Sequence, residues 1–156
     1  MEKFAGNIAE HLKKLNLRLW QKKPSRYGKR NNHRIAVLIT ALFAALIGTY
    51  LDLIFAGKQM YAFPKRPFPD IFTVNIAFTL IILPICIVIF LEIAKNLRTL
   101  QTIVLTLFLG LLVSVTEHAS EQSGFFTHSH AWHHAYSFFG YILFMLLIYR
   151  IYRWFL

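Results

Sequence analysis

Charged side chains are scarce in this 156-residue chain and are missing from long parts of it. Lys, Arg, Asp and Glu make up 15% of the residues, whereas apolar types make up 56%. A buried helix of a soluble protein has a polar face that recurs every three or four residues, and Ile81–Phe90 has none. The uncharged stretches are each close to the roughly 20 residues that a helix needs to cross a bilayer. We therefore predict an all-α, integral membrane bundle of four transmembrane helices, with spans at about 35–55, 71–93, 99–118 and 132–152.

Cysteine is nearly absent too, because Cys86 is the only one. A single cysteine excludes a disulfide framework within the chain. The length leaves room for one transmembrane domain, which we place at residues 34–156. About 34 residues precede the first apolar run, which is longer than the core of a signal peptide. We expect that run to remain as a span.

Acidic residues are few: 7 Asp and Glu stand against 17 Lys and Arg, for a net charge of +10. Ten of the basic residues precede Ile35, and four more lie between the second and third spans or after the fourth. Three lie in the first loop and none in the third. Cytoplasmic loops carry the excess of Lys and Arg. The distribution predicts a cell-membrane protein with both termini in the cytoplasm.

Residues 1–33 form a basic segment in which Phe4, Ile8 and Leu12 recur at helical spacing. This pattern is typical of an amphipathic helix on an anionic inner leaflet. A solvated basic tail and a partner-binding helix are the alternatives. The stretch 21–32 is expected to be a linker, and we expect no nucleic-acid binding. The predicted contacts with the membrane surface are Lys13, Lys14, Arg18 and Trp20.

Two positions in the second span and the loop before it carry structural predictions. Pro84 lacks a backbone N–H and is expected to kink the second helix. Asp70 stands where a capping residue for that helix is expected.

Five of the seven histidines lie between His118 and His134, at the predicted outer face. Glu117 and Glu121 are one helical turn apart if the third helix continues through them. His130, His133 and His134 share a face if the fourth helix begins near His130. Converging imidazoles and carboxylates suit Zn, Fe or Mn. The candidate metal ligands are Glu117, His118, Glu121, His130, His133 and His134.

Several other functions remain open. The same residues serve equally well as helix caps at the headgroup boundary, or as a pH sensor built from several close imidazoles. The chain fits a non-catalytic scaffold or accessory subunit bound to a membrane-protein partner. It also fits an oligomeric small transporter with Asp52, Asn75 and Glu117 along its pathway. With no nucleophile motif and no phosphate loop, enzymatic activity is less expected.

Two resemblances concern short motifs. His130-Ala131-Trp132-His133-His134 resembles the H-x-x-H-H box of membrane di-iron hydroxylases and desaturases, which use several such boxes, whereas this chain has one. Gly48–Asp52, Arg66–Pro69, the lone Glu117 and Trp132–Tyr141 resemble small multi-pass membrane proteins of spore-forming Gram-positive bacteria. The second resemblance implies a bacterial cytoplasmic membrane and no particular activity.

Overall fold

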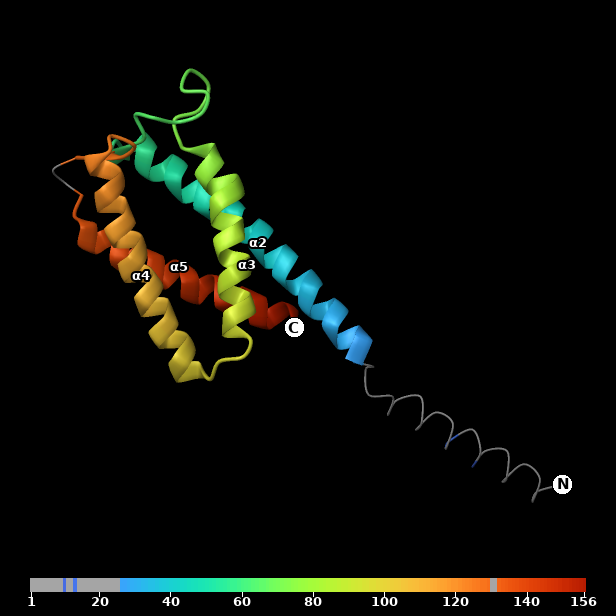
Figure 1. Ribbon diagram of the computed structural model, residues 1–156. Helices are drawn as coiled ribbons and strands as arrows, with labels where there is room; N and C mark the ends of the chain where they lie inside the picture. The colour runs from blue at the N-terminus through green and yellow to red at the C-terminus, as the bar shows by residue number, and fades with distance from the viewer. Residues whose placement is uncertain (1–9, 11–12, 14–25, 130–131) are drawn as a thin grey trace. The chain divides into compact units, whose positions relative to one another are not determined.

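Helices account for most of the structure, a computed structural model that describes residues 10, 13, 26–129 and 132–156 and, for 26–30 and 134, the backbone alone. The chain divides into two units, residues 1–33 and 34–156. The first long helix begins at Arg26, inside the stretch 21–32 that we predicted as a linker. The linker prediction is therefore wrong from Arg26 onward. The elements are α2 (Arg26–Gly57), β1 (Tyr61–Ala62), the π-helical turn η1 (Phe78–Ile82), α3 (Leu83–Ala94), α4 (Thr99–Gln122), β2 (Thr127–His128) and α5 (His134–Phe155) (Figure 1).

Three helical segments are long and apolar enough to cross a membrane: Asn31–Gly57, Thr99–Gln122 and Ala135–Phe155. The fourth apolar helical segment, Phe78–Ala94, is shorter than the span predicted at 71–93. At a rise of about 1.5 Å per residue it covers roughly 26 Å, slightly less than the hydrocarbon layer. The structure thus confirms three spans by length and composition.

The second helix starts late because Arg66 holds the preceding loop in a turn. Its guanidinium donates hydrogen bonds to the carbonyl oxygens of Phe63 (2.7 Å), Pro69 (3.0 Å) and Phe72 (2.5 Å). These bonds hold residues 63–72 in a loop, where the helix had been predicted to begin at about residue 71. Asp70 is not the cap that we predicted, since Asn75 Oδ1 accepts the hydrogen bond from the Phe78 N–H (3.3 Å).

The proline of the second helix coincides with a change of helix type. Pro84 lies in the first turn of α3, directly after the π-helical turn η1. A proline cannot donate to the preceding turn, and π turns inside helices are frequent at functional sites. At the position where we expected a kink, the helix thus has a widened π-helical turn before Pro84. This turn faces the site described below.

Small residues on α2 bring the other helices close. Ala36, Ala41 and Ala44 are buried in one core cluster with side chains of α3 and α5. A Cβ atom on Gly48 would stand 2.5 Å from Leu83 Cδ2. Close approach between helices is the usual role of small residues in membrane bundles. The α3 and α5 members of the cluster are Leu83, Ile87, Phe90, Leu91, Ala94, Phe144, Met145, Ile148 and Tyr152.

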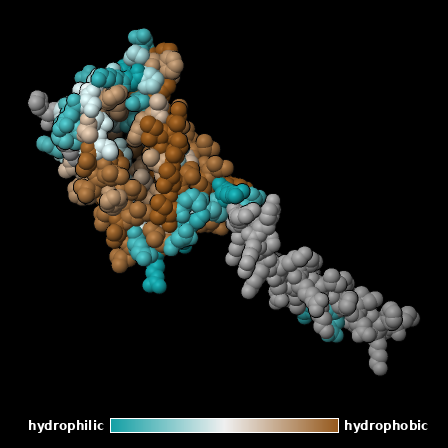
Figure 2. Space-filling model, viewed as in Figure 1, coloured by the Kyte–Doolittle hydropathy of each residue, from teal (hydrophilic) through white to brown (hydrophobic). Residues whose placement is uncertain are grey.

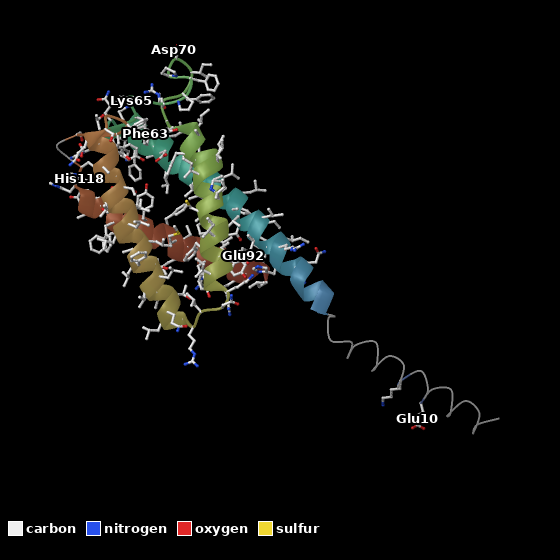
Figure 3. The ribbon with its side chains drawn as sticks, in the orientation of Figure 1. Glu10, Phe63, Lys65, Asp70, Glu92 and His118 are labelled. Atoms are coloured by element: carbon white, nitrogen blue, oxygen red, sulfur yellow. The ribbon has the colours of Figure 1, made fainter. Side chains whose placement is uncertain are left out.

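The two long loops, 58–77 and 123–133, meet at one end of the 34–156 unit, opposite the turn at 95–98 (Figure 1). Tyr61 pairs with His128 and Ala62 with Thr127 in a short antiparallel ladder. The Lys65 ammonium donates to the Ser123 carbonyl (2.9 Å) at the same end (Figure 3). We call this end of the bundle the loop end.

The sides of the bundle are apolar. Leu42, Leu100 and Leu143 expose 66%, 73% and 68% of their surface. Figure 2 shows a hydrophobic belt with polar residues above and below it. Such exposure would be unfavourable in water, where contiguous apolar patches are small. Lipid is the environment that fits these helices.

Candidate functional site

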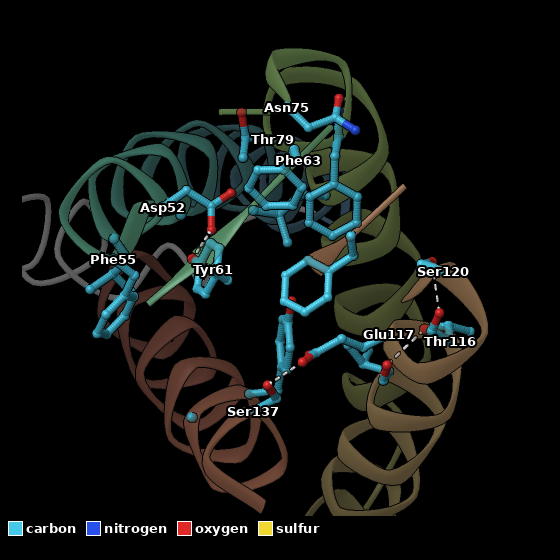
Figure 4. Close-up of a pocket in the computed structure, with 18 of the residues that line it drawn as sticks. Asp52, Phe55, Tyr61, Phe63, Asn75, Thr79, Thr116, Glu117, Ser120 and Ser137 are labelled. Carbon is cyan, nitrogen blue, oxygen red and sulfur yellow. Dashed lines mark hydrogen bonds between the residues drawn. The ribbon is translucent and has the colours of Figure 1, made fainter. Parts of the chain in front are cut away.

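A cavity of about 470 Å³ lies within the bundle near the loop end. All four long helical segments and both loops contribute to its wall (Figure 4). A cavity of this size with a few polar groups among apolar ones is the usual form of a small-molecule site. The lining residues are Gly48, Leu51, Asp52, Phe55, Met60, Tyr61, Phe63, Asn75, Phe78, Thr79, Leu83, Val113, Thr116, Glu117, Ser120, Phe125, Phe126, Trp132, Tyr136, Ser137, Gly140, Tyr141 and Phe144.

Asp52, in the last two turns of α2, brings one carboxylate to this wall. Its Oδ1 accepts a hydrogen bond of 2.5 Å from the Tyr61 hydroxyl of β1. Burial, together with the nearby Asp52 carboxylate, raises the pKa of Tyr61 well above its ordinary value. Tyr61 therefore keeps its proton and remains a donor to Asp52.

Glu117 brings a second carboxylate from α4, on the opposite side of the cavity (Figure 4). Its Oε1 accepts a hydrogen bond from the Ser137 hydroxyl of α5 (2.7 Å). The Ser137 oxygen in turn accepts from the indole N–H of Trp132 (3.1 Å). This chain of bonds fixes the direction of Glu117, and an ionised carboxylate has about four acceptor positions, so further donors find room.

The π-helical turn contributes a polar atom without a partner. Thr79 is 1% exposed, and its Oγ1 has no hydrogen-bond partner in the described part of the chain. An unsatisfied buried hydroxyl is unfavourable by about 1–3 kcal/mol. Thr79 and Asn75 both line the cavity.

Aromatic rings make up much of the remaining wall. Tyr61, Phe126 and Trp132 are buried together in a separate hydrophobic cluster at the loop end. The Trp132 ring stands edge-on to both Phe55 (5.4 Å between centroids) and Tyr61 (5.3 Å). Among the described residues that line the cavity, ten are Phe, Tyr or Trp and none is Lys, Arg or His.

The predicted metal ligands that the structure describes do not all face one point, and several have different partners. Glu121 contacts His128, with 2.6 Å between Oε1 and Nδ1. His118 lies on the exposed side of α4, 3.2 Å from the Gln122 amide nitrogen (Figure 3). Glu117 instead bonds to Ser137 in the cavity. In the described part of the chain, no three His, Cys, Asp or Glu side chains are placed to hold one metal ion.

The fourth helix begins two residues later than predicted, so that His133 lies outside it. Helix α5 begins at His134, and His133 is the extended residue before it, with its ring against Tyr136. The expected shared helical face of His130, His133 and His134 therefore does not form. His130 and the side chain of His134 lie outside the described residues, so metal binding remains a prediction.

Of the predicted membrane-surface residues, Lys13 is helical and exposed. Lys14, Arg18 and Trp20 lie outside the described residues.

No protein-family model, curated protein or solved structure matches this chain. The arguments for function therefore rest on the chemistry of the cavity.

Proposed function

We propose that this protein is a membrane protein that binds an organic ammonium cation in the cavity at its loop end. The observation that carries the proposal is the lining: two carboxylates, Asp52 and Glu117, ten aromatic rings, and no basic side chain among the described lining residues. An ionisable residue placed at membrane depth is a functional candidate by default, because its burial is unfavourable.

The sign of the charge favours a cation. Two carboxylates in a low-dielectric wall raise the local concentration of positive ligands and disfavour anions. Aromatic faces add attraction for an ammonium group, worth about 0.5–2 kcal/mol for each good contact. An anionic or neutral ligand gains neither contribution.

The separation of the two carboxylates favours an organic cation over a metal ion as the ligand. A tight transition-metal site needs three or four ligands that converge on one point. Asp52 and Glu117 instead lie on opposite sides of the cavity, each held by a hydroxyl group (Figure 4). An alkylated ammonium group within an aromatic wall fills such a space, whereas a bare metal ion does not.

Titration of purified protein in lipid nanodiscs with benzyltrimethylammonium tests the proposal directly. We expect saturable binding, weakened about tenfold or more by Asp52→Asn or Glu117→Gln, because each removes a charged partner. Asp70→Asn is the matched control, since it removes a carboxylate from an exposed loop residue outside the cavity. Equal binding of benzoate, or acid variants that bind like the control, would contradict the proposal.

We further propose four membrane crossings, with both termini cytoplasmic and the cavity at the outer side. The pairing of Tyr61 with His128 supports four crossings. If α3 did not cross, α4 would carry residues 123–133 to the opposite side of the bilayer from β1, and no ladder would form. The basic residues support the orientation, since Lys95, Arg98, Arg150 and Arg153 all lie away from the loop end.

A further inference from the structure

The cavity is covered on the side of the loop end. Tyr61, Phe126 and Trp132 are each less than one tenth exposed and pack on one another above the cavity. The β1–β2 ladder and the bond from Lys65 to the Ser123 carbonyl hold the two loops together over this layer. A ligand that entered past these three residues would have to separate packed aromatic rings.

The side between α3 and α4 is more open. Helix α4 packs mainly on α5, and α3 and α4 diverge from their shared turn at 95–98 towards the loop end (Figure 1). Thr79 lines the cavity from the α3 side and Thr116 from the α4 side, and Thr116 is exposed. Figure 2 shows a hollow on this face, below the loops.

The surroundings of this opening are hydrocarbon-like. Ile82 and Ile85 are 50% and 54% exposed on the α3 side, and Leu112 and Val115 are 47% and 59% exposed on α4. Side chains of this kind are stable against lipid and not against water. The lateral opening therefore faces the acyl chains of the bilayer.

We infer that the ligand is a membrane-borne amphiphile, an ammonium head group on an unbranched hydrocarbon chain, which enters sideways between α3 and α4. This inference rests on the proposed function. The head group lies between Asp52 and Glu117, and the chain passes Thr116 into the bilayer. The head gains charge complementarity inside the cavity, and the chain keeps its apolar surroundings throughout.

The test is a series of alkyltrimethylammonium ions with one, six and ten carbons in the chain, titrated into protein in nanodiscs. Binding is corrected for partitioning with empty nanodiscs. We expect the corrected affinity to rise at least tenfold from the shortest to the longest member. Equal corrected affinity along the series would overturn the lateral-entry inference and leave the proposed function standing, whereas no binding by any member or by benzyltrimethylammonium would remove both.

A variant with a larger side chain at the opening provides a second test of lateral entry. Thr116→Trp is expected to reduce binding of the ten-carbon ion at least tenfold more than it reduces binding of tetramethylammonium. Val104→Trp, at an exposed α4 position outside the cavity lining, is the matched control. If Thr116→Trp reduced the affinity for both ions equally, a general loss of the cavity would explain the result and the inference would fail. The chain-length series on the unaltered protein stands even if that variant does not fold.

Discussion

At the scale of single residues, the contact between Tyr61 and Asp52 makes a prediction about stability at high pH. The folded chain holds the Tyr61 proton through burial and the neighbouring carboxylate, so its pKa lies above the ordinary value of 10.0. Below that value, both folded and unfolded chains keep the proton and the contribution is complete. Above it, the unfolded chain releases the proton and the folded chain does not, so stability falls as pH rises.

We therefore expect the melting temperature in detergent to fall less steeply between about pH 9 and 11 in Tyr61→Phe than in the unaltered protein. At neutral pH the same variant should be less stable by about 1–3 kcal/mol, because Asp52 loses its donor. Tyr50→Phe, at a position 65% exposed on α2, should keep the original pH dependence. Parallel curves for all three proteins would show that Tyr61 does not hold its proton as argued.

Gly48 makes a second residue-scale prediction, on packing. Its hydrogen faces Leu83, and a Cβ there would stand 2.5 Å from Leu83 Cδ2, so Gly48→Ala forces the α2 and α3 contact to shift. Overpacking of this kind is destabilising by about 1–3 kcal/mol. Gly140→Ala, where a Cβ meets nothing within 4 Å, should leave thermal unfolding unchanged or slightly raised. A Gly48→Ala variant as stable as Gly140→Ala would refute this account of the interface.

At the scale of elements, hydropathy predicted the helices better than it predicted their ends. Runs without charge specify spans because lipid excludes unpaired polar groups. Helix α4 continues past the predicted end at 118 to Gln122, so Glu117 and Glu121 do lie one turn apart on it. The second and fourth helices start later than predicted, at Phe78 and His134 where 71 and 132 were expected. These starts depend on the folding of the loops that precede the helices, such as the turn in which Arg66 donates to three nearby carbonyl oxygens, and hydropathy carries no information about such a turn.

The cavity was only partly visible in the sequence. Asp52, Asn75 and Glu117 were noticed as polar positions in apolar surroundings, and the structure places all three around one cavity. Tyr61 and Ser137 were not predicted as site residues, since a tyrosine in a loop and a serine in a span are common and carry no charge. Their importance comes from the bonds to the two carboxylates, which require β1 to meet β2 and α4 to pack on α5.

At the scale of the whole molecule, the side of the membrane on which the cavity lies decides which leaflet supplies a ligand. Cysteine labelling tests this in a Cys86→Ser background, since Cys86 is the only native thiol. Asp70→Cys lies in the first long loop and Asn96→Cys in the opposite turn, and both positions are exposed. An impermeant maleimide added to intact cells should label the first variant and reach the second only after permeabilisation.

Each alternative outcome has a distinct structural meaning. The reverse labelling pattern would place the loop end in the cytosol and make the inner leaflet the source of the amphiphile. Labelling of both positions from outside would mean that α3 does not cross. Helix α4 would then separate β1 from β2 by the full thickness of the bilayer, which is incompatible with the pairing of Tyr61 with His128. The ladder of two residue pairs is thus the observation behind the proposed crossing of the short helix, and the two cysteines test that proposal.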